Sequence, residues 1–386
     1  MNPLYAEMPT SIFAHMSALA VAHHAVNLGQ GFPDFGWPDD VVAKAAEALT
    51  HGSNQYAPML GLPALREAIA DHYRHHQGLA LAPAQVFVTS GATEALAAAI
   101  LALVSPGDEV LLFQPLYDAY LPLVLRAGGV PRFLALAPPD WRITAAALAE
   151  AFTERTRLVI FNNPHNPTAR VFGRDELALL ADACVAHDAV ALTDEVWEHL
   201  VFDGRAHVPL ASLPGMAERT VKVGSAGKIF SLTGWKVGWV AAPAALAGPI
   251  AKAHQYLAYA TPPNLQAAVA YGLGKADAYY DGMRRAFEAA RDDLAARLAE
   301  IGYVALTAEG TYFLNVDLAA SGIAGDDACF CDRAVRAAGV AGIPVSAFYA
   351  ERPVTTIVRL CFAKREETLA AGIEGLARAR DLMRAP

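Results

Sequence analysis

The stretch Ser225-Ala226-Gly227-Lys228-Ile229-Phe230-Ser231-Leu232-Thr233-Gly234-Trp235-Lys236-Val237-Gly238 places one lysine, Lys228, among small and apolar residues. A hydroxyl stands three positions before it, at Ser225, and a second cation, Lys236, stands eight positions after it. Apolar surroundings lower the pKa of an amine and free it to attack a carbonyl, as a Schiff-base lysine must. The stretch alone fits equally a surface lysine with a buried aliphatic stem. Its meaning therefore depends on the rest of the chain.

The composition indicates a folded protein with a sizeable core. The chain has 386 residues, of which 54% are hydrophobic and only 18% are charged, so disorder is not expected. This length suits one large α/β domain with a smaller partner. The net charge of −9 and the lack of a Lys/Arg run argue against nucleic-acid binding.

The cysteines and histidines point to a reduced compartment without a structural metal. The four cysteines are scattered, and no His-x-x-x-His pair is accompanied by an acidic ligand, so we expect free thiols and no metal site. The first residues lack a basic segment followed by an apolar core, and the longest apolar run is too short to cross a bilayer. We therefore expect a cytoplasmic protein that does not bind membranes.

From residue 86 onward, apolar runs alternate with helical patterns. The runs cover 86–89, 110–113, 130–136, 158–162 and 189–193, and the helical patterns cover 93–105, 117–127, 144–153 and 174–187. Near-continuous apolar strands separated by helices are typical of a mostly parallel sheet that is covered on both faces. We predict an α/β fold of this type.

The pattern of the C-terminal part predicts a second, smaller domain. A further strand is predicted at 237–241 and a long helix at 284–301, followed by strands at 311–316, 343–345 and 357–362 and helices near 326–338 and 365–383. We predict a large domain over 38–290. A small α+β domain would combine 1–37 with 291–386.

Three groups near predicted strand ends and one arginine inside a strand could bind a ligand, although each also has an ordinary explanation. Gly91-Ala92-Thr93 forms a strand-to-helix turn that can hold a phosphate, but most such turns bind nothing. Asp194 could cap the N-terminus of a helix, or its carboxylate could pair with a buried cation. Asn166 could be an ordinary turn residue. Arg359 lies inside an apolar strand, where its charge must be paired. A substrate carboxylate can accept two parallel hydrogen bonds from the planar guanidinium.

Together these groups resemble the class I/II pyridoxal-phosphate aminotransferases of fold type I, the aspartate aminotransferase superfamily. The resemblance covers nearly the whole chain and is closest to the branch with methionine and kynurenine–glutamine aminotransferases. The matching stretches are 27–35, 54–58, 90–96, 163–168, 225–238 and 357–364. It implies a mostly parallel mixed sheet flanked by helices, pyridoxal 5′-phosphate as the cofactor and a homodimer with shared active sites.

The resemblance also implies roles for individual residues. Lys228 forms the Schiff base and moves the proton, Asp194 keeps the pyridine nitrogen protonated, and the remaining roles fall into three groups. Tyr117 stacks on the ring, and Asn166 bonds its phenolic oxygen. The phosphate is surrounded by Gly91, Ala92, Thr93, Ser225, Lys236 and Tyr56 of the other subunit. The substrate is bound by Arg359, Asn166, Gly31, Phe32 and Tyr259, with Phe35 beside Phe32 in the apolar part of the pocket.

One position departs from the family pattern. The family usually has a tyrosine three residues after the aspartate, which hydrogen-bonds the cofactor's phenolic oxygen, and this chain has Trp197. An indole donates one hydrogen bond but neither accepts one nor titrates. It either packs beside the ring and still donates, or shifts the pKa of the Schiff base.

The expected activity is an amino transfer from an α-amino acid to a 2-oxo acid. With no clear second arginine for a side-chain carboxylate, methionine, glutamine, aromatic amino acids and kynurenine are better candidates than aspartate. A C–S β-lyase on the same scaffold is the first alternative. A non-catalytic, cofactor-sensing regulator would carry an added N-terminal DNA-binding domain, for which we expect no room.

Overall fold

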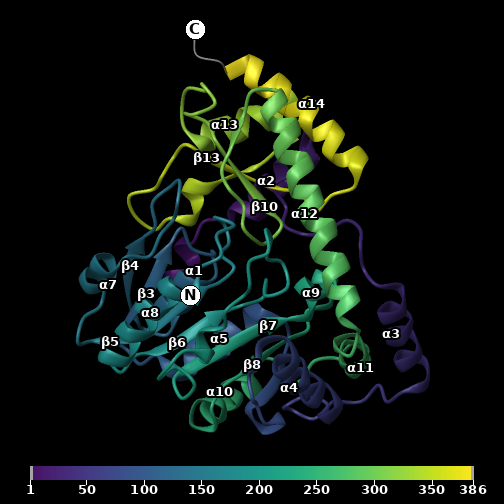
Figure 1. The fold of residues 1–386 in the computed structure, drawn as a ribbon, viewed down its shortest axis with the longest axis vertical. Helices are drawn as coiled ribbons and strands as arrows, with labels where there is room; N and C mark the ends of the chain where they lie inside the picture. Colours follow the sequence, from purple (N-terminus) through teal and green to yellow (C-terminus); the bar gives the residue numbers. More distant parts are fainter. Residues whose placement is uncertain (1–2, 384–386) are drawn as a thin grey trace.

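The computed structural model describes residues 3–383. Its largest element is a seven-stranded sheet, shown in the lower half of Figure 1. In spatial order its strands are β2 (Val86–Thr89), β8 (Gly238–Ala241), β7 (Thr220–Ser225), β6 (Val190–Asp194), β5 (Thr156–Asn162), β3 (Glu109–Gln114) and β4 (Val130–Ala135). Strand β8 is antiparallel to both of its neighbours, and the other pairings are parallel. The predicted mostly parallel sheet is thus confirmed.

Both faces of this sheet carry apolar side chains and are buried. Leu111 and Val159 belong to one hydrophobic cluster, whereas their chain neighbours Leu112 and Leu158 belong to another. Successive residues of a strand point to opposite faces, so these unbroken apolar runs require helices on both sides. The covering helices are α4 (Pro63–Gln77), α5 (Ala92–Leu103), α6 (Tyr120–Arg126), α7 (Ala145–Ala151), α8 (Arg174–Ala186), α9 (Ala226–Ile229), α10 (Ala244–Leu257) and α11 (Pro263–Leu273). Helix α3 (Asp39–His51) packs on α11.

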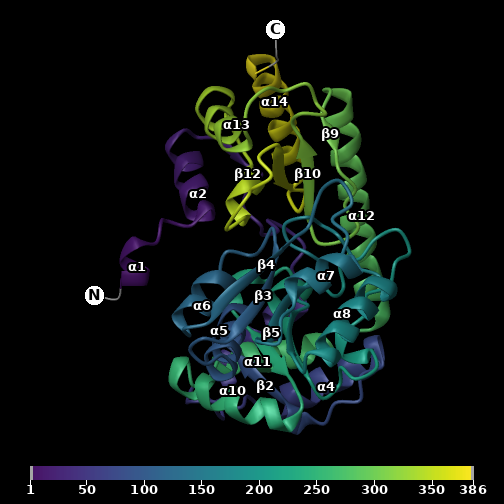
Figure 2. The same ribbon diagram turned by 90° about the vertical axis from the view of Figure 1, so that its left-hand side faces the viewer.

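A second unit lies at the other end of the molecule, as Figures 1 and 2 show. Its antiparallel sheet has the order β12 (Ile343–Pro344), β13 (Ile357–Cys361), β10 (Phe313–Asp317) and β9 (Val304–Ala305). Near it lie α2 (Ile12–Ala22), α13 (Asp327–Arg333) and α14 (Glu366–Met383), whereas α1 (Pro3–Glu7) lies beside α6 of the large unit. A short parallel pair of β1 (Val26–Asn27) and β11 (Val340–Ala341) joins the N-terminal segment to this unit.

The helix α12 (Asp277–Glu300) runs between the two units along one side of the molecule (Figure 1). It begins seven residues earlier than predicted, with Asp277 in its first turn, where a carboxylate is favoured. The domain boundary predicted near residue 290 falls inside this unbroken helix. The division into domains stays a prediction.

Candidate active site

One cavity lies at the carboxyl ends of the parallel strands, where ligands bind in sheets of this kind. Strand β5 ends at Asn162, β6 at Asp194 and β7 at Ser225. Twelve of the residues predicted for the site line this cavity, namely Gly31, Phe32, Gly91, Ala92, Thr93, Tyr117, Asn166, Asp194, Trp197, Ser225, Lys228 and Lys236. Residues that are far apart in the sequence therefore meet in one space.

Lys228 lies on the single-turn helix α9, directly after β7, and its half-buried side chain lines the cavity. Its Nζ donates a hydrogen bond to Tyr312 Oη at 3.1 Å and lies 4.6 Å from the centre of the Trp197 ring. Burial lowers the pKa of Lys228 to about 8, although the nearby carboxylate of Asp194 acts in the opposite direction. A useful fraction of this amine is thus neutral near physiological pH.

Asp194 presents a carboxylate with one oxygen occupied and one free. Oδ2 accepts a hydrogen bond from Tyr120 Oη at 2.7 Å. Oδ1 is buried and has no hydrogen-bond partner among residues 3–383. Burial raises the pKa of this carboxyl, and the bond from Tyr120 opposes the shift. A buried acceptor without a partner is costly, so this oxygen is available to a donor or a cation in the cavity.

The opposite wall is formed by the N-terminus of α5. Gly91 precedes this helix with φ of +80°, a value that favours glycine. A Cβ at this position would lie 3.0 Å from Lys236 Cε and 3.1 Å from its Nζ. Glycine therefore lets the ammonium of Lys236 approach the free N–H groups at the helix start, which together favour an anion.

Arg359 is held behind the cavity, on β13 of the second sheet. Its side chain is 1% exposed, Nη1 donates to Asn166 Oδ1 at 2.7 Å, and Nη2 donates to the carbonyl of Gly29 at 3.1 Å. The guanidinium lies 3.8 Å from the centre of the Phe313 ring, and its Nε has no partner in the described part of the chain. Burial lowers its pKa to about 10, so it remains a cation with unused donor capacity.

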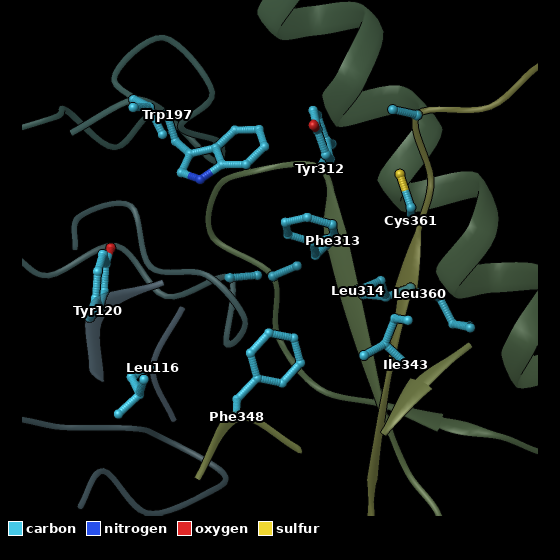
Figure 3. Close-up of a cluster of buried hydrophobic side chains, with 14 of the residues drawn as sticks. Leu116, Tyr120, Trp197, Tyr312, Phe313, Leu314, Ile343, Phe348, Leu360 and Cys361 are labelled. Atoms are coloured by element: carbon cyan, nitrogen blue, oxygen red, sulfur yellow. The ribbon is translucent and has the colours of Figure 1, made fainter. Parts of the chain in front are cut away.

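Trp197 forms part of the boundary between the two units. Its buried ring meets the ring of Tyr312 edge-on, with centroids 4.3 Å apart, and contacts Phe313 at 5.6 Å. Figure 3 shows these three rings beside one another. Whether the indole also donates to a bound cofactor or shifts the pKa of the Schiff base stays a prediction.

Three residues near the site were not predicted. Tyr120 bonds Asp194, and Tyr312 bonds both Lys228 and the carbonyl of Gly31. Asn162 donates to the Asp194 carbonyl at 2.7 Å and accepts from the backbone of Asn166 at 2.7 Å. The position of Asn162 at a strand end was a usable signal, whereas both tyrosines come from elements whose approach the sequence does not reveal.

Besides Arg359, two predicted residues lie outside the cavity. The side chains of Tyr56 and Tyr259 are 88% and 43% exposed, and their rings meet edge-on at 5.9 Å. Phe35, which we expected beside Phe32, instead lines a separate cavity and packs on Phe287. The expectation for Phe35 is therefore wrong, because the chain turns at Gly36 and directs this ring towards α12.

The arrangement unites a lysine of low pKa, a carboxylate with a free oxygen, an anion cradle and a buried arginine. Residues 23–376 match the family model described as aminotransferase class I and II. The chain belongs to the class I and II aminotransferases. Enzymes of this family use pyridoxal 5′-phosphate and exchange amino groups between amino acids and 2-oxo acids, so this chain is a pyridoxal-phosphate-dependent aminotransferase.

Aminotransferases that are named after different substrates match this chain over almost its whole length. A probable N-succinyldiaminopimelate aminotransferase of Mycobacterium tuberculosis is 46% identical, with 95% of this chain and 96% of the relative covered. The methionine aminotransferase of Escherichia coli is 43% identical, with 96% of each chain covered. The solved structure of the mycobacterial enzyme superposes with a TM-score of 0.93, covering 96% of this chain and 97% of that one. The fold class is thus confirmed.

No helix within residues 3–383 is long and apolar enough to cross a membrane.

Proposed function

We propose that this aminotransferase takes the amino group from a neutral α-amino acid with a large side chain, such as methionine, glutamine, an aromatic amino acid or kynurenine, and passes it to a 2-oxo acid. The observation that carries the proposal is the lining of the cavity. Phe32, Leu96 and Val196 contribute apolar surface, and Arg359 behind the cavity is the one arginine among the described residues that we assign to a substrate carboxylate. A second carboxylate on the substrate would lack a forked partner there.

The residues of the cavity fit the cofactor. The unpaired Oδ1 of Asp194 suits a protonated pyridine nitrogen, because that carboxylate is otherwise buried with a free oxygen. The close approach of Lys236 to Gly91 at the start of α5 suits the phosphate. Ala92, Thr93 and Ser225 line the same wall, and Tyr117 and Asn166 line the space that the ring would occupy.

In this proposal the bound cofactor supplies a carbonyl group and an electron sink. Lys228 would hold the cofactor through Nζ. Its amine, once free, would take up the proton that leaves the substrate Cα and give it back later in the transfer. A pKa of about 8 suits this task, because a proton-transfer group works best when its pKa is near the working pH.

Arg359 is proposed to bind the substrate α-carboxylate. The guanidinium already contacts Asn166 and the Gly29 carbonyl, so its plane is fixed before the substrate arrives. Such preorganisation lowers the entropic cost of binding. Gly31 and Phe32 line the cavity nearby, and we assign them to substrate contact.

The active unit is proposed to be a homodimer. Tyr56 and Tyr259 are exposed yet packed on each other, and they lie outside the cavity of their own chain. We infer that this pair enters the partner's site, where Tyr56 reaches the phosphate and Tyr259 lines the substrate pocket.

A panel of amino donors against several 2-oxo acids tests the substrate proposal. It includes methionine, glutamine, phenylalanine, kynurenine, aspartate and N-succinyldiaminopimelate, with the visible absorbance of the bound cofactor as a second readout. The proposal predicts that donors with neutral side chains have the highest kcat/KM and that the exchange is ping-pong. A preference for aspartate or N-succinyldiaminopimelate would contradict it. Release of ammonia and pyruvate from a cysteine conjugate without any oxo acid would instead identify a β-lyase.

A further inference from the structure

A group of histidines lies on the far side of the Asp194–His199 segment from the active site. We call His72, His76, His199 and Glu198 the histidine cluster. His72 and His76 are one turn apart on α4, and Glu198 and His199 follow Trp197 in the chain. The Nε2 atoms of His72 and His199 are 2.8 Å apart. The ring of His76 is centred 4.5 Å from that of His72 and 5.0 Å from that of His199.

The imidazoles of this cluster lie inside the protein. His72 is 3% exposed and His199 is half-buried. An imidazole nitrogen with a lone pair is a common metal ligand.

Glu198 contributes a buried carboxylate with unused capacity. Its Oε2 is held by Lys222 at 2.9 Å and by Gln77 at 2.6 Å. Its Oε1 is buried without a hydrogen-bond partner among residues 3–383, and the side chain is almost fully buried. A carboxylate oxygen of Glu198 lies within 4.8 Å of a ring nitrogen of both His72 and His199. Because an unpaired buried oxygen is costly, this atom points to a missing ligand.

The buried carboxylates around the histidine cluster outnumber the buried ammonium groups there. Lys222 forms ion pairs with both Glu195 and Glu198, so this buried group has two carboxylates for one ammonium. His207 contacts Glu195 at 2.8 Å, and one of its ring nitrogens also lies within 4.8 Å of a carboxylate oxygen of Glu198. With Lys222 held by Glu195, the free oxygen of Glu198 remains available to a metal ion.

We propose that His72, His199 and Glu198 bind a divalent transition-metal ion of the Zn²⁺ type. Two nitrogens and a carboxylate oxygen are ligands that Zn²⁺ accepts, and ligands at about 2.0–2.1 Å in a tetrahedron lie about 3.3 Å apart. The two Nε2 atoms share a hydrogen bond of 2.8 Å, which the ion would replace as the rings open to the wider separation. His76, four residues from His72 on the same helix face, or a water molecule completes the coordination.

Solvent can reach this site from a surface cavity that is separate from the active site. His76, Glu198, His199 and Tyr280 line it. The arginines at this cavity are paired, Arg205 with Glu309 and Arg284 with Asp281. An entering cation therefore meets arginines whose charges are already neutralised. Because Trp197 directly precedes Glu198, a bound ion would also fix the segment that forms the active-site wall.

The sequence analysis predicted no metal site, because no acidic ligand stood near a His-x-x-x-His pair in the chain. The fold supplies that ligand from Glu198. His72 and His76 are the i, i+4 pair that metal-binding helices use, and this signal could have been found.

Metal binding to the cofactor-loaded enzyme tests the proposal. After treatment with a chelator and removal of free cofactor, the protein is titrated with Zn²⁺ by equilibrium dialysis and with Co²⁺ by its visible absorbance. We expect one saturable equivalent per chain, with a Co²⁺ spectrum typical of nitrogen and oxygen ligands. His72→Gln, His199→Gln and Glu198→Gln should each weaken binding at least about 100-fold, more than loss of an outer-shell partner does.

Two matched controls locate the ion. His51→Asn removes an exposed histidine elsewhere and should change nothing. His75→Asn removes an exposed histidine that faces Asp277 and should leave the high-affinity equivalent intact. Retention of the cofactor absorbance by each variant confirms that it is folded. Absence of saturable binding in the wild type, equal binding by the three cluster variants, or loss of binding in His75→Asn would each overturn the proposal.

Discussion

Lys228 Nζ lies 3.1 Å from the hydroxyl of Tyr312, which donates its own proton to the carbonyl of Gly31 at 2.6 Å. The three groups come from α9, from the turn before β10 and from the N-terminal loop. One hydroxyl therefore connects the candidate catalytic lysine with the loop that lines the substrate end of the cavity.

The first prediction follows from this contact. Because an ammonium donates a stronger hydrogen bond than an amine, Tyr312→Phe should destabilise the charged form of Lys228 and lower its pKa by up to about one unit. The reactive form is the neutral amine, so the apoenzyme variant should take up pyridoxal phosphate faster at pH 7 and reach its plateau at lower pH. The rate of cofactor uptake between pH 7 and 10 measures this.

Tyr303→Phe is the matched control, since it removes a buried hydroxyl that donates to the carbonyl of Leu376, away from Lys228. Superimposable pH profiles for Tyr312→Phe and the wild type would show that the contact has no influence on the lysine.

Arg359→Lys should raise KM for amino acids and oxo acids alike by about 10–100-fold. A point charge cannot reproduce a two-pronged grip on a carboxylate, and a charge-assisted hydrogen bond contributes about 1.5–3 kcal/mol. An amine substrate without the carboxylate should be nearly indifferent to the change. Similar losses on both substrates would mean that the arginine supports the packing of Phe313 and not the substrate.

The shared-site proposal can be tested by mixing inactive chains. Lys228→Ala and Tyr56→Phe damage different components of one site if Tyr56 enters the partner. Heterodimers should then contain one site without either lesion, and activity should rise above that of the separate variants. A mixture that exchanges subunits without recovering activity would refute this proposal.

Trp197→Tyr should lower, by about one unit, the pH at which the visible absorbance of the lysine-bound cofactor changes. A phenol that donates to the cofactor's phenolic oxygen stabilises its negative charge, and a hydrogen-bond difference of ~1.4 kcal/mol corresponds to one unit. Trp197→Phe, which has no donor, separates this effect from packing against Tyr312. Coinciding titrations of Trp197→Tyr and the wild type would show that the indole already donates equivalently.

Much of the fold follows from local patterns in the sequence. The strands of the large sheet are apolar runs between turn residues, and the predicted strand at 158–162 falls within β5 (Thr156–Asn162). The helix predicted at 117–127 instead begins at Tyr120, because Tyr117 lies in the preceding loop and lines the cavity. The two-residue strands β1 and β9 were not predicted, because so short a pairing leaves no periodic pattern.

The site was predictable where its residues stand at strand ends and not where they approach from another element. Asp194 ends β6 and Lys228 follows β7, so the topology itself brings them to one edge. Tyr312 belongs to the second unit, and its contact with Lys228 depends on how the two units pack. The histidine cluster likewise depends on α4 lying beside the segment after β6.

The central claim is that Lys228 carries the cofactor. Borohydride reduction of the cofactor-loaded enzyme, followed by proteolysis and mass spectrometry, tests it directly. We predict one pyridoxyl group per chain on Lys228, and none on Lys222 or Lys236. The Lys228→Ala variant should fold, bind the cofactor without covalent attachment and give no labelled peptide. A pyridoxyl group on any other lysine of the wild type would contradict the account.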